Sequence, residues 1–118
     1  MKGKDRGTTG NLFDLNGIDP DASEWFETLA SGENLIIERI VSHGQTTPGN
    51  QWYDQELDEW VILLQGEASL EFQDGEVLGL QKGDYTFIPA HKKHRVTFTS
   101  TAPPCVWLAI HASNLRSQ

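Results

Sequence analysis

Short apolar segments, each closed by turn-forming residues, divide most of this chain and are the feature that most restricts its fold. Residues 68–72 alternate strictly, with Ala68, Leu70 and Phe72 on one side, as a β-strand with one buried face requires. Asp74-Gly75 follows and is typical of a tight β-hairpin. About eight short strands are expected in all, which favours an all-β barrel or double sheet. The other strand-length segments are residues 35–41, 60–64, 77–80, 85–88, 94–99 and 105–111.

One segment before the first of these strands favours a helix. In residues 21–30, Asp21 and Glu24 have the three-residue spacing of a capping box. The predicted helix would have one apolar face that packs on the sheet, formed by Trp25, Phe26 and Leu29. The polar residues 1–20 before it are expected to form an arm that is partly disordered or draped over a neighbour. Residues 21–118 are expected to form a single domain.

Composition limits the classes of function. With 9 Lys and Arg against 17 Asp and Glu, the chain has a formal net charge of −8, which disfavours binding to nucleic acid or to an anionic membrane surface. No apolar run approaches the roughly 20 residues of a membrane span, and no apolar stretch follows the basic N-terminus as in a secretory signal. The single cysteine, Cys105, cannot form an internal disulfide and lies in an apolar strand, so a structural role is expected. We therefore expect a cytoplasmic protein.

His94 is the first candidate for a functional side chain. It shares strand parity with Val96 and Phe98, which predicts an imidazole on the inward, apolar face. A buried imidazole needs a hydrogen-bond partner, and this partner is either a backbone carbonyl or a bound ligand.

The spacing around His94 resembles the second motif of the cupin superfamily, G-x5-P-x-G-x2-H-x3-N. Gly83, Pro89 and His94 occupy the matching positions. The chain departs from the motif twice, because His91 stands where the family has glycine and Phe98 where it has asparagine.

A degenerate copy of the first cupin motif, G-x5-H-x-H-x3/4-E-x6-G, lies upstream between Gly49 and Gly66 and places its glutamate at Glu59. With the three-residue spacer, the two histidine positions hold Tyr53 and Gln55. With the four-residue spacer they hold Trp52 and Asp54. Neither pair contains a histidine, so the resemblance is stronger for the fold than for the metal chemistry of the family.

The resemblance implies a single cupin-type jelly-roll β-barrel that carries the short N-terminal helix. It also implies a homodimer, in which the arm of residues 1–20 could be swapped between copies. In similar cupins the motif glutamate and histidine bind a divalent metal inside the barrel, which carries over to Glu59 and His94. Gln55 and Tyr53 would replace the missing histidines. Such a set of nitrogen and oxygen ligands would suit Fe, Mn, Ni, Zn or Cu, and the sequence does not select one.

If the three-residue spacer holds, strand parity places Tyr53, Gln55 and Glu59 on one face. A carboxylate inside an apolar barrel must be paired, protonated or bound to a cation. His111, on the last strand, and His43, after the first strand, are candidates to complete a site. Alternatively, Glu59 hydrogen-bonds Tyr53, His94 or His43 without any metal. Further ligand-binding candidates at the barrel mouth are Trp52 and His91, beside which Lys92 and Lys93 would attract an anion.

Two kinds of function agree with these observations. The first is a small cupin that holds a divalent metal, a small-molecule ligand or both in its barrel; as an enzyme it would be a metal-dependent oxidoreductase, isomerase or lyase acting on a small substrate. The second is a metal-free cupin that binds a small ligand without catalysis. The sequence does not name the ligand, and it does not decide whether the protein is an enzyme.

Overall fold

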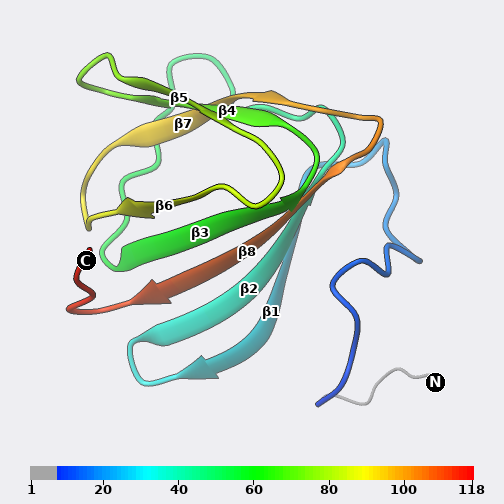
Figure 1. Cartoon of the computed structure of the whole chain (residues 1–118), viewed down its shortest axis with the longest axis horizontal. Coiled ribbons are helices and arrows are strands. Elements are labelled where there is room, and N and C mark those ends of the chain that lie inside the picture. The colour runs from blue at the N-terminus through cyan, green and yellow to red at the C-terminus, as the bar shows by residue number, and fades with distance from the viewer. Residues whose placement is uncertain (1–7) are drawn as a thin grey trace.

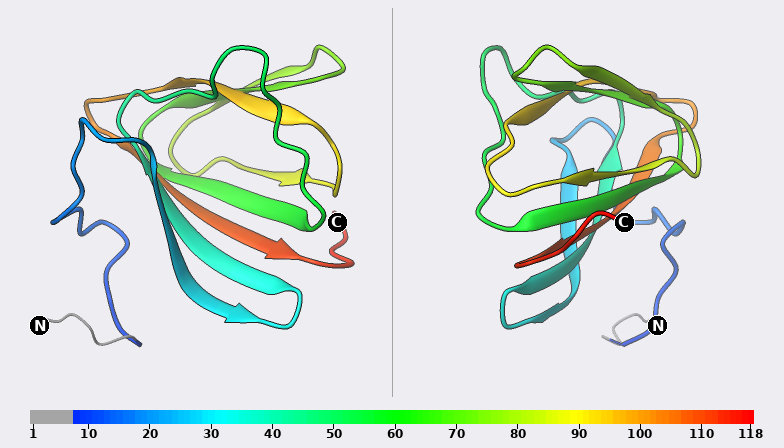
Figure 2. Two further views of the ribbon diagram at one scale, coloured as in Figure 1. Left: turned by 180° about the vertical axis from the view of Figure 1, so that it is seen from behind. Right: turned by 60° about the vertical axis from the view of Figure 1, so that its left-hand side comes forward.

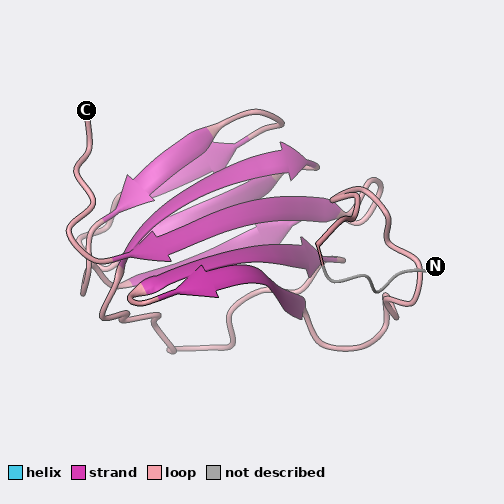
Figure 3. Cartoon of the chain, turned by 90° about the horizontal axis from the view of Figure 1, so that it is seen from below, coloured by secondary structure: helices cyan, strands magenta, loops and turns pink. Residues whose placement is uncertain are grey.

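The computed structural model describes residues 8–118, which form eight β-strands and no helix (Figures 1 and 3). The described part of the chain therefore contains no helix that could cross a membrane. Five strands form one antiparallel sheet in the order β1-β2-β8-β3-β6, and three form a second in the order β5-β4-β7. The strands are β1 (Trp25–Gly32), β2 (Leu35–Ser42), β3 (Asp58–Gln65), β4 (Ala68–Phe72), β5 (Val77–Leu80), β6 (Tyr85–Ile88), β7 (His94–Thr99) and β8 (Cys105–Ala112).

The two sheets lie face to face (Figure 1). Side chains from both sheets form one hydrophobic core cluster. From the smaller sheet, β4 buries Ala68, Leu70 and Phe72, the three residues that its alternation predicts. From the larger sheet, the core includes Leu63 of β3 and Trp107 of β8. The hairpin predicted at Asp74-Gly75 joins β4 to β5, and the prediction of an all-β double-sheet fold is confirmed.

The predicted helix over residues 21–30 is wrong. Residues 25–32 form β1, which pairs antiparallel with β2 from Trp25 opposite Val41 to Gly32 opposite Leu35. Glu24 does not cap a helix, because its carboxylate accepts a hydrogen bond from the Ser42 hydroxyl. Strand pairing with β2 has overridden a weak local preference for helix. The apolar face expected to pack on the sheet is partly exposed instead, at Trp25, Phe26 and Leu29.

The predicted strand parity of β7 is wrong beyond Val96. The pairing of β4 with β7 shifts between Ser69 and Leu70, so that Leu70 lies opposite Val96 while Ser69 lies opposite Phe98. This bulge in β7 inserts one residue and reverses the side to which the following residues point. Phe98 is consequently 48% exposed and Thr99 only 3% exposed.

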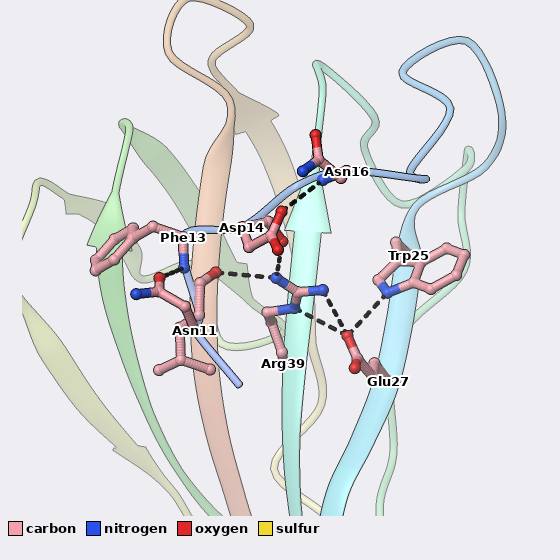
Figure 4. A network of polar contacts seen from close by, with 8 residues as sticks. Asn11, Phe13, Asp14, Asn16, Trp25, Glu27 and Arg39 are labelled. Atoms are coloured by element: carbon pink, nitrogen blue, oxygen red, sulfur yellow. Dashed lines mark hydrogen bonds and ion pairs between the residues drawn. The ribbon is translucent and has the colours of Figure 1, made fainter. Parts of the chain in front are cut away.

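Arg39 of β2 holds the segment before β1 on the outer face of the five-stranded sheet (Figure 4). The Arg39 guanidinium donates to the carbonyls of Leu12 at 3.0 Å and Asp14 at 2.7 Å, and also to the Glu27 carboxylate of β1. Figure 2 shows this segment along one flank of the larger sheet, away from β4 and β5. The predicted arm falls partly outside the described residues, at residues 1–7, and its exchange between copies stays a prediction.

Candidate functional site

A small cavity of about 80 Å³ lies between the two sheets. Its apolar wall includes Leu70 of β4, Ile88 of β6 and Val96 of β7. Seven polar or ionisable side chains share the lining with these residues. They are Glu24, Glu38, Tyr53, Gln55, Glu59, His94 and His111.

Glu59 is the most deeply buried carboxyl group of this cavity. It belongs to the inward parity of β3 together with Val61 and Leu63, and 6% of the residue is exposed. Its Oε1 atom is buried and has no hydrogen-bond partner among the described residues. Burial, together with the nearby Glu38 carboxylate, raises the pKa of Glu59 to about 7, although His111 opposes the shift. The carboxyl group is therefore close to half protonated near neutral pH.

His94, the first residue of β7, faces Glu59 with its Nε2 atom 3.8 Å from Glu59 Oε1. Its Nδ1 atom lies 3.0 Å from the carbonyl oxygen of Lys92, which can only accept, so Nδ1 carries the proton. Burial lowers the pKa of His94, which favours the neutral ring. The Nε2 lone pair of that neutral ring is then available to a ligand atom lying between His94 and Glu59.

Tyr53 and Gln55 reach the cavity from the segment before β3, and the turn before β7 holds this segment in place. Tyr53 exchanges two backbone hydrogen bonds with His94, of 2.7 and 3.2 Å, and the His91 amide donates to the Gln55 carbonyl at 2.8 Å. Burial raises the pKa of the Tyr53 phenol, and the Glu24, Glu59 and Glu38 carboxylates add to the shift. The phenol therefore remains protonated and can donate a hydrogen bond.

His111 of β8 lies beside a second carboxylate of the cavity. Its Nε2 atom is 3.4 Å from Oε1 of Glu38 in β2. The hydrogen bond to Glu38 raises the pKa of His111 more than burial lowers it. Glu38, Gln55 and His111 also border a shallow outer groove, which continues along Ile36 and residues 56–57. These three side chains stand between the groove and the cavity.

Glu24 contributes the third carboxyl group from the segment just before β1. The Glu24 carboxylate accepts a hydrogen bond from the Ser42 hydroxyl, and the Ser42 oxygen accepts one from the Trp107 indole N–H at 3.2 Å. Burial raises the pKa of Glu24, and Glu38 adds to the shift, whereas the hydrogen bond from Ser42 lowers it. This chain of hydrogen bonds orients Glu24 and Trp107 along the cavity wall.

Three of the residues predicted for the site do not line the cavity. Trp52 stacks on the Arg95 guanidinium, with 4.5 Å between the guanidinium carbon and the ring centroid. His91 is exposed and pairs with Asp54 at 2.7 Å. His43 lies just after β2, where its amide donates to the Gln45 side chain. The structure brings together the other five predicted residues, which are Tyr53, Gln55, Glu59, His94 and His111.

The donor atoms do not fit a resident divalent metal. Such ions in proteins generally require three or more protein ligands that converge on one point. Within residues 8–118, no three His, Cys, Asp or Glu side chains are arranged to hold a metal ion. Glu59 and His94 supply two donors, but His111 is paired with Glu38, and the H-x-H positions hold a phenol and an amide.

Sequence reasoning missed Glu24 and Glu38 as cavity residues. Glu38 has the parity of Ile36 and Ile40, but the opposite parity of β2 is also apolar, so alternation did not mark Glu38 as inward-facing. Glu24 carried no signal either, because its position depends on β1 pairing with β2 rather than forming a helix.

Comparison with known proteins identifies the family. The family model described as "Cupin domain" matches residues 38–111. A crystal structure of a "putative mannose-6-phosphate isomerase" from Ralstonia eutropha JMP134 is 39% identical, covers 89% of this chain and 97% of its own, and has a TM-score of 0.81. A cupin superfamily protein from Desulfitobacterium hafniense DCB-2 is 22% identical over 78% of this chain and 79% of its own, with a TM-score of 0.66.

An RmlC-like cupin family protein with a double-stranded β-helix fold, from Methanocaldococcus jannaschii, is 20% identical. It covers 80% of this chain and 85% of its own, with a TM-score of 0.64. No protein of curated function matches this chain significantly. The cupin domain matched over residues 38–111, together with the double-sheet fold, shows that this chain belongs to the cupin superfamily, as a small single-domain cupin.

Proposed function

We propose that this cupin binds a compact, uncharged or cationic small molecule in its cavity, without a resident metal ion, and that Glu59 is the group that holds it. The observation that carries the proposal is the buried Oε1 atom of Glu59, which has no partner among the described residues. A buried polar atom of this kind costs free energy unless a hydrogen bond compensates it. A ligand donor placed between Glu59 and His94 would supply that bond.

The charges around the cavity argue against a phosphorylated ligand, such as the substrate in the name of the Ralstonia protein. The lining includes three glutamates, and neither Lys nor Arg is among its described residues. Lys92, proposed above to attract an anion, lies over the Phe72 ring and 3.7 Å from the Glu76 carboxylate. A phosphate would therefore meet carboxylates instead of the cations that phosphate sites use.

Glu59 and His94 also favour a second function, proton transfer to or from the bound molecule. General acid–base groups work best when their pKa lies near the working pH, and the pKa of Glu59 is raised to about 7. The neutral His94 ring presents Nε2 as a proton acceptor on the other side of the 3.8 Å gap. An isomerase or lyase acting on a small molecule would use such a pair.

The first test is the metal content of protein purified without chelator or added metal. Plasma mass spectrometry is expected to find well below one divalent ion per chain in the wild type. A Glu59→Gln/His94→Ala double variant serves as the control and should give the same low content. Near-stoichiometric metal in the wild type that disappears from the double variant would contradict the proposal of a metal-free site.

The second test is a titration with acetamide, a compact neutral molecule that can both donate and accept hydrogen bonds. We expect it to shift the NMR signals of the Glu59 and His94 amides and of the Trp107 indole N–H, with affinity in the millimolar range. Glu59→Leu removes the acceptor and should weaken binding at least about tenfold. Glu33→Leu, an exposed site in the β1–β2 turn, is the matched control. Equal affinity in the two variants would show that Glu59 does not hold the ligand.

A further inference from the structure

The three carboxyl groups of the cavity converge on it from separate parts of the chain. Glu24 precedes β1, Glu38 lies in β2 and Glu59 lies in β3. They are close enough to influence one another, because the Glu38 carboxylate raises the pKa of both Glu24 and Glu59. Neither Lys nor Arg of residues 8–118 lines the cavity, so two of these carboxyl groups that ionise together leave more negative charge than a protonated His111 can balance.

Among the described residues, one carboxylate oxygen of the cavity has no hydrogen-bond partner. Glu24 receives the Ser42 hydroxyl, and Glu38 pairs with His111. Glu59 Oε1 receives no hydrogen bond from the described residues, and only 8% of the Glu59 side chain is exposed. The ionised form of Glu59 needs a hydrogen-bond donor as its partner, and a positively charged donor would also relieve the repulsion among the carboxylates.

The remaining walls suit an organic cation better than a metal ion. Tyr53, Trp107 and Phe26 contribute aromatic side chains to the lining, and the faces of aromatic rings attract ammonium groups. A metal ion requires ligands gathered at one point, whereas Ser42 engages Glu24 and His111 engages Glu38. A primary ammonium group has three N–H donors that can point toward different acceptors.

We infer that the cavity binds a small organic ammonium ion, with its positive charge placed among Glu24, Glu38 and Glu59 and its carbon atoms against Tyr53 and Trp107. This inference rests on the proposed function and narrows it to one class of ligand. The cavity volume of about 80 Å³ suits a ligand with only a few non-hydrogen atoms.

Three probes that share one isopropyl body and differ in charge test the inference. Isopropylammonium, propan-2-ol and isobutyrate are titrated separately at pH 7.5 and constant ionic strength, and the NMR shifts of the Trp107 indole and the Glu59 amide are followed. Isopropylammonium is expected to bind at least about tenfold more tightly than propan-2-ol, corresponding to about 1.4 kcal/mol. Isobutyrate should bind most weakly of the three.

A Glu24→Gln/Glu38→Gln double variant removes two charges while leaving Glu59 in place. It should reduce the preference for isopropylammonium over propan-2-ol by about tenfold or more. Glu33→Gln/Glu67→Gln, at two exposed positions outside the cavity, controls for net charge. The same loss of preference in both double variants would assign the effect to overall charge and overturn the inference.

The wild-type titrations test the inference even if a variant fails to fold. Equal binding of isopropylammonium and propan-2-ol at the cavity would overturn the ammonium inference but leave the proposed small-molecule site intact. If neither these probes nor acetamide shift the signals of the lining residues, the proposed function itself fails.

Discussion

Glu59→Gln is expected to stabilise this protein at alkaline pH by about 3 kcal/mol and to change its stability little near pH 4.5. The pKa of Glu59 is raised from 4.5 to about 7 in the folded state, chiefly by burial, and this difference corresponds to about 3 kcal/mol. The folded state therefore favours the protonated carboxyl group. The stability that this preference contributes is fully present below pH 4.5 and is lost as the pH rises through about 7.

Glutamine stays uncharged throughout this range, so the variant avoids the loss. Urea unfolding at pH 5, 7 and 8.5 measures the effect, with Glu33→Gln as the exposed control of the same chemistry. The difference between wild type and Glu59→Gln should grow from pH 5 to pH 8.5, while Glu33→Gln follows the wild type. Parallel curves for all three proteins would mean that Glu59 ionises at the same pH in the folded and unfolded chains.

Gly66→Ala is expected to cost about 4 kcal/mol of stability, far more than the same change at Gly75. Both glycines lie in turns with positive φ, 92° at Gly66 and 98° at Gly75. A Cβ at Gly66 would lie 2.8 Å from Ser100 Oγ, 2.9 Å from Cys105 Sγ and 3.0 Å from Cys105 Cα. Cys105 is fully buried at the start of β8, so neither its thiol nor its backbone can move away easily.

Gly75 is the matched control, because a Cβ there meets nothing within 4 Å. Gly75→Ala should cost only the backbone strain of a positive φ, about 1 kcal/mol. Urea unfolding of the two variants separates steric overlap from this strain. Equal losses in the two variants would show that the contact with Ser100 and Cys105 contributes nothing.

The alternation of side chains along a strand predicted the parts of the site that depend on a single strand. Side chains alternate along an extended chain, so Glu59 and Val61 had to share one face of β3. His111 has the same strand parity as Trp107 on β8, and both line the cavity. The spacing from Gly83 to His94 marked the inward histidine of β7 before any tertiary contact was known.

The rule failed where the backbone departs from regular extension or where loops place a side chain. The bulge in β7 reversed the parity of Phe98. His91 and Trp52 lie in irregular segments, and their side chains are engaged by Asp54 and Arg95 outside the cavity. The alternation of residues along the sequence does not predict such contacts between distant segments.

The sequence by itself determined the all-β class, the β4–β5 hairpin and the inward face of β3, because each follows from alternation and turn chemistry within a few residues. Only the tertiary structure decided that residues 25–32 form a strand, since β2 offers a free edge with which they pair. That pairing brings Glu24 to Ser42 and places Glu24 and Glu38 beside Glu59. Hydrogen bonding along a sheet edge outweighs the local helix preference of this short segment. The charge of the cavity therefore depends on contacts between strands that are distant in the sequence.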